Sequence, residues 1–136
     1  MLEAFITSGG TSLAPRTYRG TLDTYEYKTV RYKGHCERID FDAIRKLPKA
    51  GKDLAILRVD CTNAKGRGVR YQMLQYYDEA TGFTAMEQTT GYPAAAIAEE
   101  LPALRDGAYT PEGCGFGSEH VRALRKRGLS IRRTIL

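Results

Sequence analysis

Tryptophan is absent from this 136-residue sequence, and cysteine and histidine are scarce, with three and two residues. The cysteines (Cys36, Cys61 and Cys114) form neither a CxxC pair nor a Cys/His ligand spacing, which argues against a zinc site and favours reduced thiols. No apolar run approaches the ~18 residues of a membrane-spanning helix. The first residues, MLEAFITSGG, lack the basic and long apolar regions of a signal peptide. The sequence therefore predicts a cytoplasmic protein with no membrane partner.

The composition is otherwise that of a folded domain, with 42% apolar and 27% charged residues. At this length we expect one domain over residues 1–136, because single domains commonly contain ~100–150 residues. The net charge of +5 comes largely from arginines and lysines near the C-terminus. A basic surface can face an anionic substrate as well as nucleic acid, and no nucleic-acid recognition motif accompanies the charge. We therefore expect no nucleic-acid partner.

Hydrophobic periodicity gives a coarse order of elements after a small-residue segment over 1–20 that is typical of a loop. The patterns predict, in chain order, a strand over 22–32, a helix over 35–47, a hairpin of strands 54–62 and 69–77, a turn over 78–82, a strand over 83–90, a helix from Pro93, a helix over 118–128 and a strand over 129–136. This order predicts an α+β fold: a largely antiparallel or mixed sheet with helices packed on one face.

The segment Thr89-Thr90-Gly91-Tyr92-Pro93 joins a β-branched stretch to a strongly helix-forming one. We expect the helix to begin at Pro93, because proline is tolerated in the first turn, where its missing N–H would have no partner. The unpaired N–H groups and the positive end of the helix dipole could then accept a carboxylate or phosphate beside Gly91. The alternative is that Thr90 only caps the helix.

A second candidate site lies in KTVRYKGH (28–35), at the end of the first predicted strand. Arg31 could clamp a carboxylate through two hydrogen bonds, and His35 could transfer protons near neutral pH. A surface strand with paired charges is the alternative. The glycine-rich stretch EGCGFG (112–117) follows no predicted strand and lacks the rest of the dinucleotide-binding pattern, so a Rossmann fingerprint is rejected.

Several motifs occur together in an order that is found in one enzyme family. The segments LEAFITSGGTS (2–12), EYKTVRYKGHCERI (26–39), AILRVD (55–60), TGFTAMEQTTGYPAAAIA (81–98) and RGLSIRRT (127–134) resemble the C-terminal domain of the saccharopine dehydrogenase family. Lysine 6-dehydrogenases and saccharopine reductases belong to this family. The resemblance covers nearly the whole chain.

The resemblance implies a two-part enzyme that oxidises or reduces an amino-acid C–N bond by hydride transfer, with NAD or NADP bound by an N-terminal Rossmann domain. The present chain would hold no cofactor, would be inert alone, and would supply part of the substrate pocket and the contact of a homodimer. The family pattern places the substrate carboxylate on Arg31, Thr89, Thr90 and Gly91, and a proton-handling or orienting role on His35.

The chain departs from the family pattern in three respects: it contains no Rossmann half, Lys33 replaces a common proline, and the stretch between RYKGH and AILRVD is short. The alternative is a free-standing ligand-binding or interaction module that has lost the dehydrogenase. A native start at Met1 would favour the module, whereas a reading frame that continues upstream into a GxGxxG segment would favour the larger enzyme.

Overall fold

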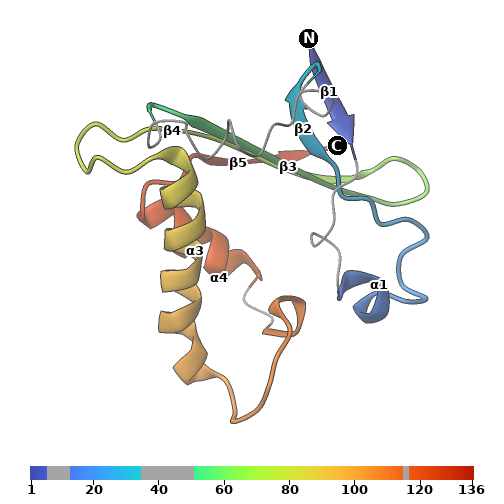
Figure 1. Ribbon diagram of the computed structural model, residues 1–136. Coiled ribbons are helices and arrows are strands. Elements are labelled where there is room, and N and C mark those ends of the chain that lie inside the picture. The colour runs from blue at the N-terminus through green and yellow to red at the C-terminus, as the bar shows by residue number, and fades with distance from the viewer. Residues whose placement is uncertain (6–12, 35–50, 115–116) are drawn as a thin grey trace. The chain divides into compact units, whose positions relative to one another are not determined.

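The computed structural model describes residues 1–5, 13–34, 51–114 and 117–136 (Figure 1). The chain divides into two compact units: Met1–Leu47 with Gly107–Gly115, and Pro48–Asp106 with Phe116–Leu136. We call the first the N-terminal unit and the second the sheet–helix unit. Both units contain strands and helical turns, so the predicted α+β class is confirmed.

The N-terminal unit contains a two-stranded antiparallel sheet, in which β1 (Leu2–Phe5) pairs with β2 (Thr29–Tyr32). The prediction of a loop over 1–20 is wrong for β1, and the predicted strand over 22–32 is present only in its last part. The reason lies in the pairing: a strand needs a neighbour for its N–H and C=O groups, and β1 reaches only the residues of β2.

Two short helical turns complete the described part of this unit. The helix α1 (Ala14–Thr17) has Pro15 in its first turn, where proline costs no hydrogen bond. The 3₁₀ helix η3 (Pro111–Cys114) lies in the glycine-rich stretch before the last helix. The predicted helix over 35–47 lies outside the described residues.

The sheet–helix unit is built on a three-stranded antiparallel sheet in the order β3–β4–β5. β3 (Leu54–Thr62) and β4 (Gly68–Tyr76) form the predicted hairpin, displaced by one residue in the second strand. A Cβ on Gly68 would lie 1.9 Å from the backbone oxygen of Cys61, so only glycine fits at the start of β4. The third strand is β5 (Ile131–Ile135), which confirms the predicted closing strand.

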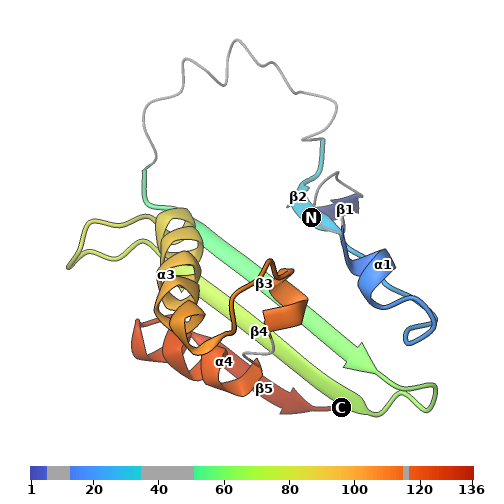
Figure 2. The same cartoon turned by 90° about the horizontal axis from the view of Figure 1, so that it is seen from below.

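Two helices lie on the same face of this sheet, as Figures 1 and 2 show. They are α3 (Ala85–Glu100), which continues into the 3₁₀ helix η2 (Leu101–Ala103), and α4 (Gly117–Lys126). The predicted placement of helices on one face is confirmed. After α4 the chain turns through Gly128, whose φ of 93° is a left-handed conformation that favours glycine. In the described residues no helix has the length and apolarity to span a bilayer.

The start of α3 corrects a prediction, because residues 83–90 are not a strand and the helix does not begin at Pro93. Its N-cap is Thr84: the Glu87 N–H donates to Thr84 Oγ1 at 3.0 Å, and the Thr84 N–H donates to the Glu87 carboxylate at 2.8 Å. This reciprocal capping box fixes the helix start eight residues before the proline. Pro93 therefore lies inside the helix.

A second anchor at the same place explains why the helix tolerates Gly91 and Pro93, which cost about 1 and 3 kcal/mol in a helix interior. The Asp53 carboxylate, just before β3, accepts hydrogen bonds from the N–H groups of Ala85 at 2.6 Å and Met86 at 3.0 Å. A carboxylate on the first N–H groups of a helix stabilises it through both hydrogen bonds and the helix dipole. Asp53 and the capping box together offset the cost of the two interior residues.

The core of the unit lies where α3 meets the strands. Its buried residues are small or polar as well as apolar: Met73, Thr84, Ala85, Gln88, Ala96 and Leu129. Gln88 joins the layers, because its amide N–H₂ donates to the carbonyls of Tyr76 at 2.9 Å and Phe83 at 3.1 Å while its oxygen accepts from Gln75 at 2.6 Å. The Gln75 oxygen in turn accepts from the Ser130 N–H at 3.1 Å.

Candidate functional site

The pairing register assigns the residues of the sheet to two faces, because opposite residues of neighbouring strands point to the same side. Gln75 and Met73 point toward the helices, and the residues that share their side form the helix face. The residues on the other side form what we call the arginine face: Leu54, Ile56, Arg58, Asp60, Thr62, Gly68, Arg70, Gln72, Leu74, Tyr76, Arg132 and Thr134.

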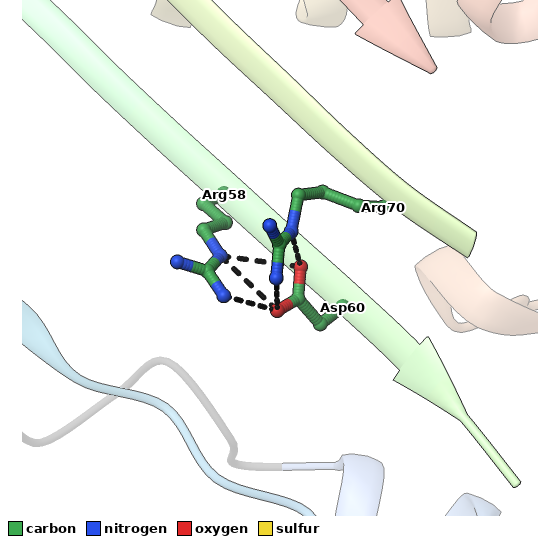
Figure 3. Close-up of polar contacts among 3 residues, drawn as sticks. All are labelled: Arg58, Asp60 and Arg70. Carbon is green, nitrogen blue, oxygen red and sulfur yellow. Dashed lines mark hydrogen bonds and ion pairs between the residues drawn. The ribbon is translucent and has the colours of Figure 1, made fainter. Parts of the chain in front are cut away.

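A charged cluster occupies the middle of the arginine face, where Asp60 accepts hydrogen bonds from two arginines (Figure 3). Arg70, opposite Asp60 on β4, donates from Nε at 2.7 Å and from Nη2 at 2.9 Å. Arg58, two residues earlier on the same strand as Asp60, donates from Nη2 at 2.6 Å and from Nε at 3.1 Å. Both guanidinium groups therefore use two nitrogens on one carboxylate, the strong bidentate arrangement.

These contacts fix the charges of the cluster. The hydrogen bonds from Arg70 and then Arg58 hold the pKa of Asp60 well below its usual range, and the hydrogen bond to Asp60 raises the pKa of Arg70. A carboxylate held in its charged form is a poor proton acceptor near neutral pH. The side chains of Arg58, Asp60 and Arg70 remain 55%, 31% and 28% exposed, so solvent reaches all three. The chemistry that this arrangement supports is anion binding by the arginines.

A third arginine extends the cluster across the sheet. Gln72 lies opposite both Arg58 on β3 and Arg132 on β5, so the three residues form a cross-strand row next to the row of Asp60 and Arg70. The Arg132 side chain makes no hydrogen bond or ion pair in the described part of the chain. With three arginines and one aspartate, this part of the arginine face has a net charge of +2.

Beside the charged cluster lies a block of apolar side chains. Leu54 is opposite Tyr76 and Ile56 is opposite Leu74, and all four are exposed. We call these residues the apolar block. A surface depression is lined by Ile56, Leu74 and Tyr76 of this block together with Gln72, Ser130 and Arg132, and it continues around the start of β5 to the helix face. The arginine face thus combines an apolar half with a cationic half.

The residues predicted from the sequence to bind substrate lie elsewhere. Arg31 is an exposed residue of β2 in the N-terminal unit, and its Nη1 donates to the carbonyl of Val30 at 3.0 Å. His35 lies outside the described residues. Thr89, Thr90 and Gly91 belong to the sheet–helix unit.

Thr89, Thr90 and Gly91 lie inside α3 rather than at its start, so the helix-terminus chemistry that we expected to hold an anion there is wrong. Backbone N–H groups in a helix interior are paired with carbonyls four residues earlier. The Thr89 hydroxyl is also used within the helix, since it donates to the carbonyl of Ala85 at 2.8 Å. The true helix start does hold an anion, but that anion is the chain's own Asp53.

Sequence reasoning missed the Arg58–Asp60–Arg70 cluster, although the signal was present. The predicted hairpin already placed Arg58 on a defined side of its strand, and Asp60 shares that side because it is two residues away. Only the register of the hairpin, set by the turn at Asn63, places Arg70 opposite Asp60. In this turn the Asn63 side chain accepts from the N–H groups of Lys65 and Arg67.

Neither a metal centre nor a dinucleotide site is built by the described residues. They contain no group of three or more His, Cys, Asp or Glu side chains placed to hold a metal ion. The glycine-rich stretch before α4 contains the 3₁₀ helix η3 and is not preceded by a strand among the described residues, so it does not fit the strand–turn–helix that cradles a dinucleotide pyrophosphate. No protein-family model matches this chain, and no solved structure gives a significant match.

Proposed function

We propose that this chain is the substrate-binding and subunit-contact domain of a saccharopine dehydrogenase-like oxidoreductase. The complete enzyme would act on an amino-acid C–N bond with NAD or NADP held by a separate Rossmann domain. By itself the chain is inert. The resemblance of its motifs, in order along nearly the whole chain, supports the family. The roles of Arg31 and His35, and of Thr89, Thr90 and Gly91 toward a substrate carboxylate, rest on that resemblance alone.

The observation that supports a contact role most directly is the apolar block on the arginine face. Four large apolar side chains on two paired strands are exposed together. Contiguous exposed apolar surface of this kind marks contact sites in folded proteins. β3 is also an edge strand of its sheet. An unprotected edge strand presents unpaired N–H and C=O groups that a partner can use. We infer that a second copy of the chain covers this surface in a homodimer.

The dimer is tested by sedimentation of the purified chain and of two matched variants. Ile56 on the arginine face and Ile135 on the helix face are each 67% exposed, so an arginine at either position causes little loss of folded packing. Ile56→Arg should weaken dimerisation by more than about tenfold, because it places a charge inside a desolvated contact. Ile135→Arg should leave the dimer intact. A monomeric wild-type chain, or equal effects of both variants, contradicts the proposed contact.

The second experiment concerns activity. The purified chain is incubated with lysine or saccharopine and with NAD⁺ or NADP⁺, and the reduced nicotinamide is followed by its absorbance. We expect no turnover, since the resemblance implies that the cofactor is held by a separate domain. Turnover by this chain alone would contradict the proposal that the cofactor is bound by another domain.

A further inference from the structure

We propose that the arginine face binds a small multivalent oxyanion, at a site formed by Arg58, Gln72 and Arg132 with Arg70 at its border. The ligand class comprises phosphate esters and di- or tricarboxylates. This inference is independent of the dehydrogenase proposal, because it uses none of the residues that the family resemblance names for substrate binding.

The sheet register brings the site together. Arg58, Gln72 and Arg132 are successive members of one cross-strand row. Neighbouring strands lie about 4.8 Å apart, so the backbones of the two arginines are roughly 10 Å from each other. Arginine side chains of this separation can converge on one anionic group above Gln72 or bind two anionic groups of one ligand. The Gln72 amide between them offers a further donor.

A structural ion pair does not account for all of these residues. One carboxylate, Asp60, faces three arginines, and its hydrogen bonds are made with Arg58 and Arg70. Arg132 is exposed and has no acidic partner in the described part of the chain. Three cations on one sheet face repel each other unless anions compensate them. An oxyanion that bridges Arg58 and Arg132 would neutralise the positive charge that Asp60 does not compensate.

Asp60 acts as a positioning residue in this site. Its carboxylate holds the Nε–Nη2 edges of Arg58 and Arg70, which leaves the Nη1 groups of both arginines unbonded in the described structure. Ordering a guanidinium group before a ligand arrives lowers the entropic cost of binding. Because the site is exposed, the attraction is screened by salt, and only ligands with more than one negative charge gain enough to bind.

Two arginines on β5 provide a matched pair of variants. Arg132 and Arg133 are adjacent in sequence, and both are exposed. They point to different faces of the sheet: Arg132 pairs with Gln72 of β4, and Arg133 pairs with Tyr71. Replacing either with alanine removes one positive charge from the molecule. Only Arg132→Ala removes a member of the proposed site. Thermal unfolding midpoints close to that of the wild type establish that the fold is intact in both variants.

Binding of inorganic pyrophosphate, citrate and acetate is measured by calorimetry and by the NMR signals of the Gln72 side-chain amide, at constant ionic strength. Wild-type protein and Arg133→Ala should bind pyrophosphate or citrate saturably, with a shift of the Gln72 signals. Arg132→Ala should bind about tenfold more weakly, as loss of a charged hydrogen-bonding partner requires. Acetate should not saturate the site.

Preference for pyrophosphate or for citrate identifies phosphate esters or polycarboxylates as the natural ligand class, and either preference supports the site. Three results would overturn it. They are equal weakening by Arg132→Ala and Arg133→Ala, saturable acetate binding of the same strength, and the absence of saturable binding by the wild-type chain. The measurements are made at protein concentrations at which sedimentation shows the chain to be monomeric, so dimerisation plays no part in them and failure here leaves the proposed function untouched.

Discussion

The two faces of the sheet β3–β4–β5 share one backbone but are used differently. On the helix face, Met73 is buried and Gln75 joins the sheet to α3 and to the turn before β5 through hydrogen bonds. On the arginine face, the neighbouring residues Leu74 and Gln72 are exposed, and the polar contacts run between charged side chains. The helix face therefore stabilises the fold, whereas the arginine face is available for contacts with other molecules.

The helices cover the helix face only in part. Leu57 and Val59 of β3 and Ile135 of β5 point to the same side as Met73 and remain exposed. The distinction between the faces is therefore sharpest at the end of β4 that contacts α3. Substitutions at that end of the sheet should therefore change stability most, whereas substitutions on the arginine face should change binding.

The largest expected effect comes from a pair of adjacent residues on opposite faces. Met73 is 8% exposed and Leu74 is 41% exposed. Met73→Ala should lower the free energy of unfolding by about 3 kcal/mol, since it leaves a cavity under α3. Leu74→Ala should lower it by less than about 1 kcal/mol. Urea unfolding of both variants measures the difference. Equal losses would mean that the two faces are packed alike.

Gln88→Ala should have the next largest effect. This side chain is 2% exposed, and its amide donates hydrogen bonds to the carbonyls of Tyr76 and Phe83. Its removal leaves buried acceptors without donors, so we expect a loss of about 2 kcal/mol in the free energy of unfolding. Thr90→Ala, at an exposed position of the same helix, is the control and should change this free energy by less than about 0.5 kcal/mol. A tolerated Gln88→Ala would argue against the glutamine link between sheet and helix.

Asp53→Ala tests the anchor of α3 and should cost about 1 kcal/mol, because two N–H groups at the helix start lose their acceptor. Asp53→Asn keeps one acceptor oxygen and should recover part of the loss. Thermal unfolding of the wild type and the two variants gives the order of their stabilities. If both variants unfold like the wild type, the helix start is held by the Thr84–Glu87 capping box alone.

The smallest expected effect, on the arginine face, appears as a pH dependence. The depressed pKa of Asp60 means that its contacts stabilise the fold at pH values above the unfolded carboxyl pKa of about 3.9 and that this stability is lost as the pH falls below it. Asp60→Asn should therefore unfold at a slightly lower temperature than wild type at neutral pH, and the difference should shrink below about pH 4. A difference that stays constant into strong acid would contradict an ion-pair origin. Other carboxylates with lowered pKa, such as Asp78 and Glu87, are present in both proteins and cancel.

The hairpin shows how far the sequence could predict the fold. Alternating residues placed β3 within its observed bounds, and the turn over 78–82 is present, with the Asp78 carboxylate accepting from the Ala80 N–H and the Thr81 hydroxyl. These features depend on local chemistry. The pairing of β1 with β2 was missed for the opposite reason: the partners are more than twenty residues apart, and a local pattern does not show which segments pair.

The segment from Phe83 to Pro93 shows where local sequence preferences stop predicting the structure and a tertiary contact takes over. The local sequence predicts a helix around AAAIAEEL and leaves open whether a bound anion or a Thr90 cap occupies its start. The position of that start depends on a tertiary contact, because Asp53, more than thirty residues earlier, reaches the N–H groups of Ala85 and Met86. A contact between distant residues outweighed the local preference of proline for a first turn. The same holds for the arginine face: the alternation of β3 fixed the side of Arg58 and Asp60, but the register of three strands brought Arg70 and Arg132 beside them.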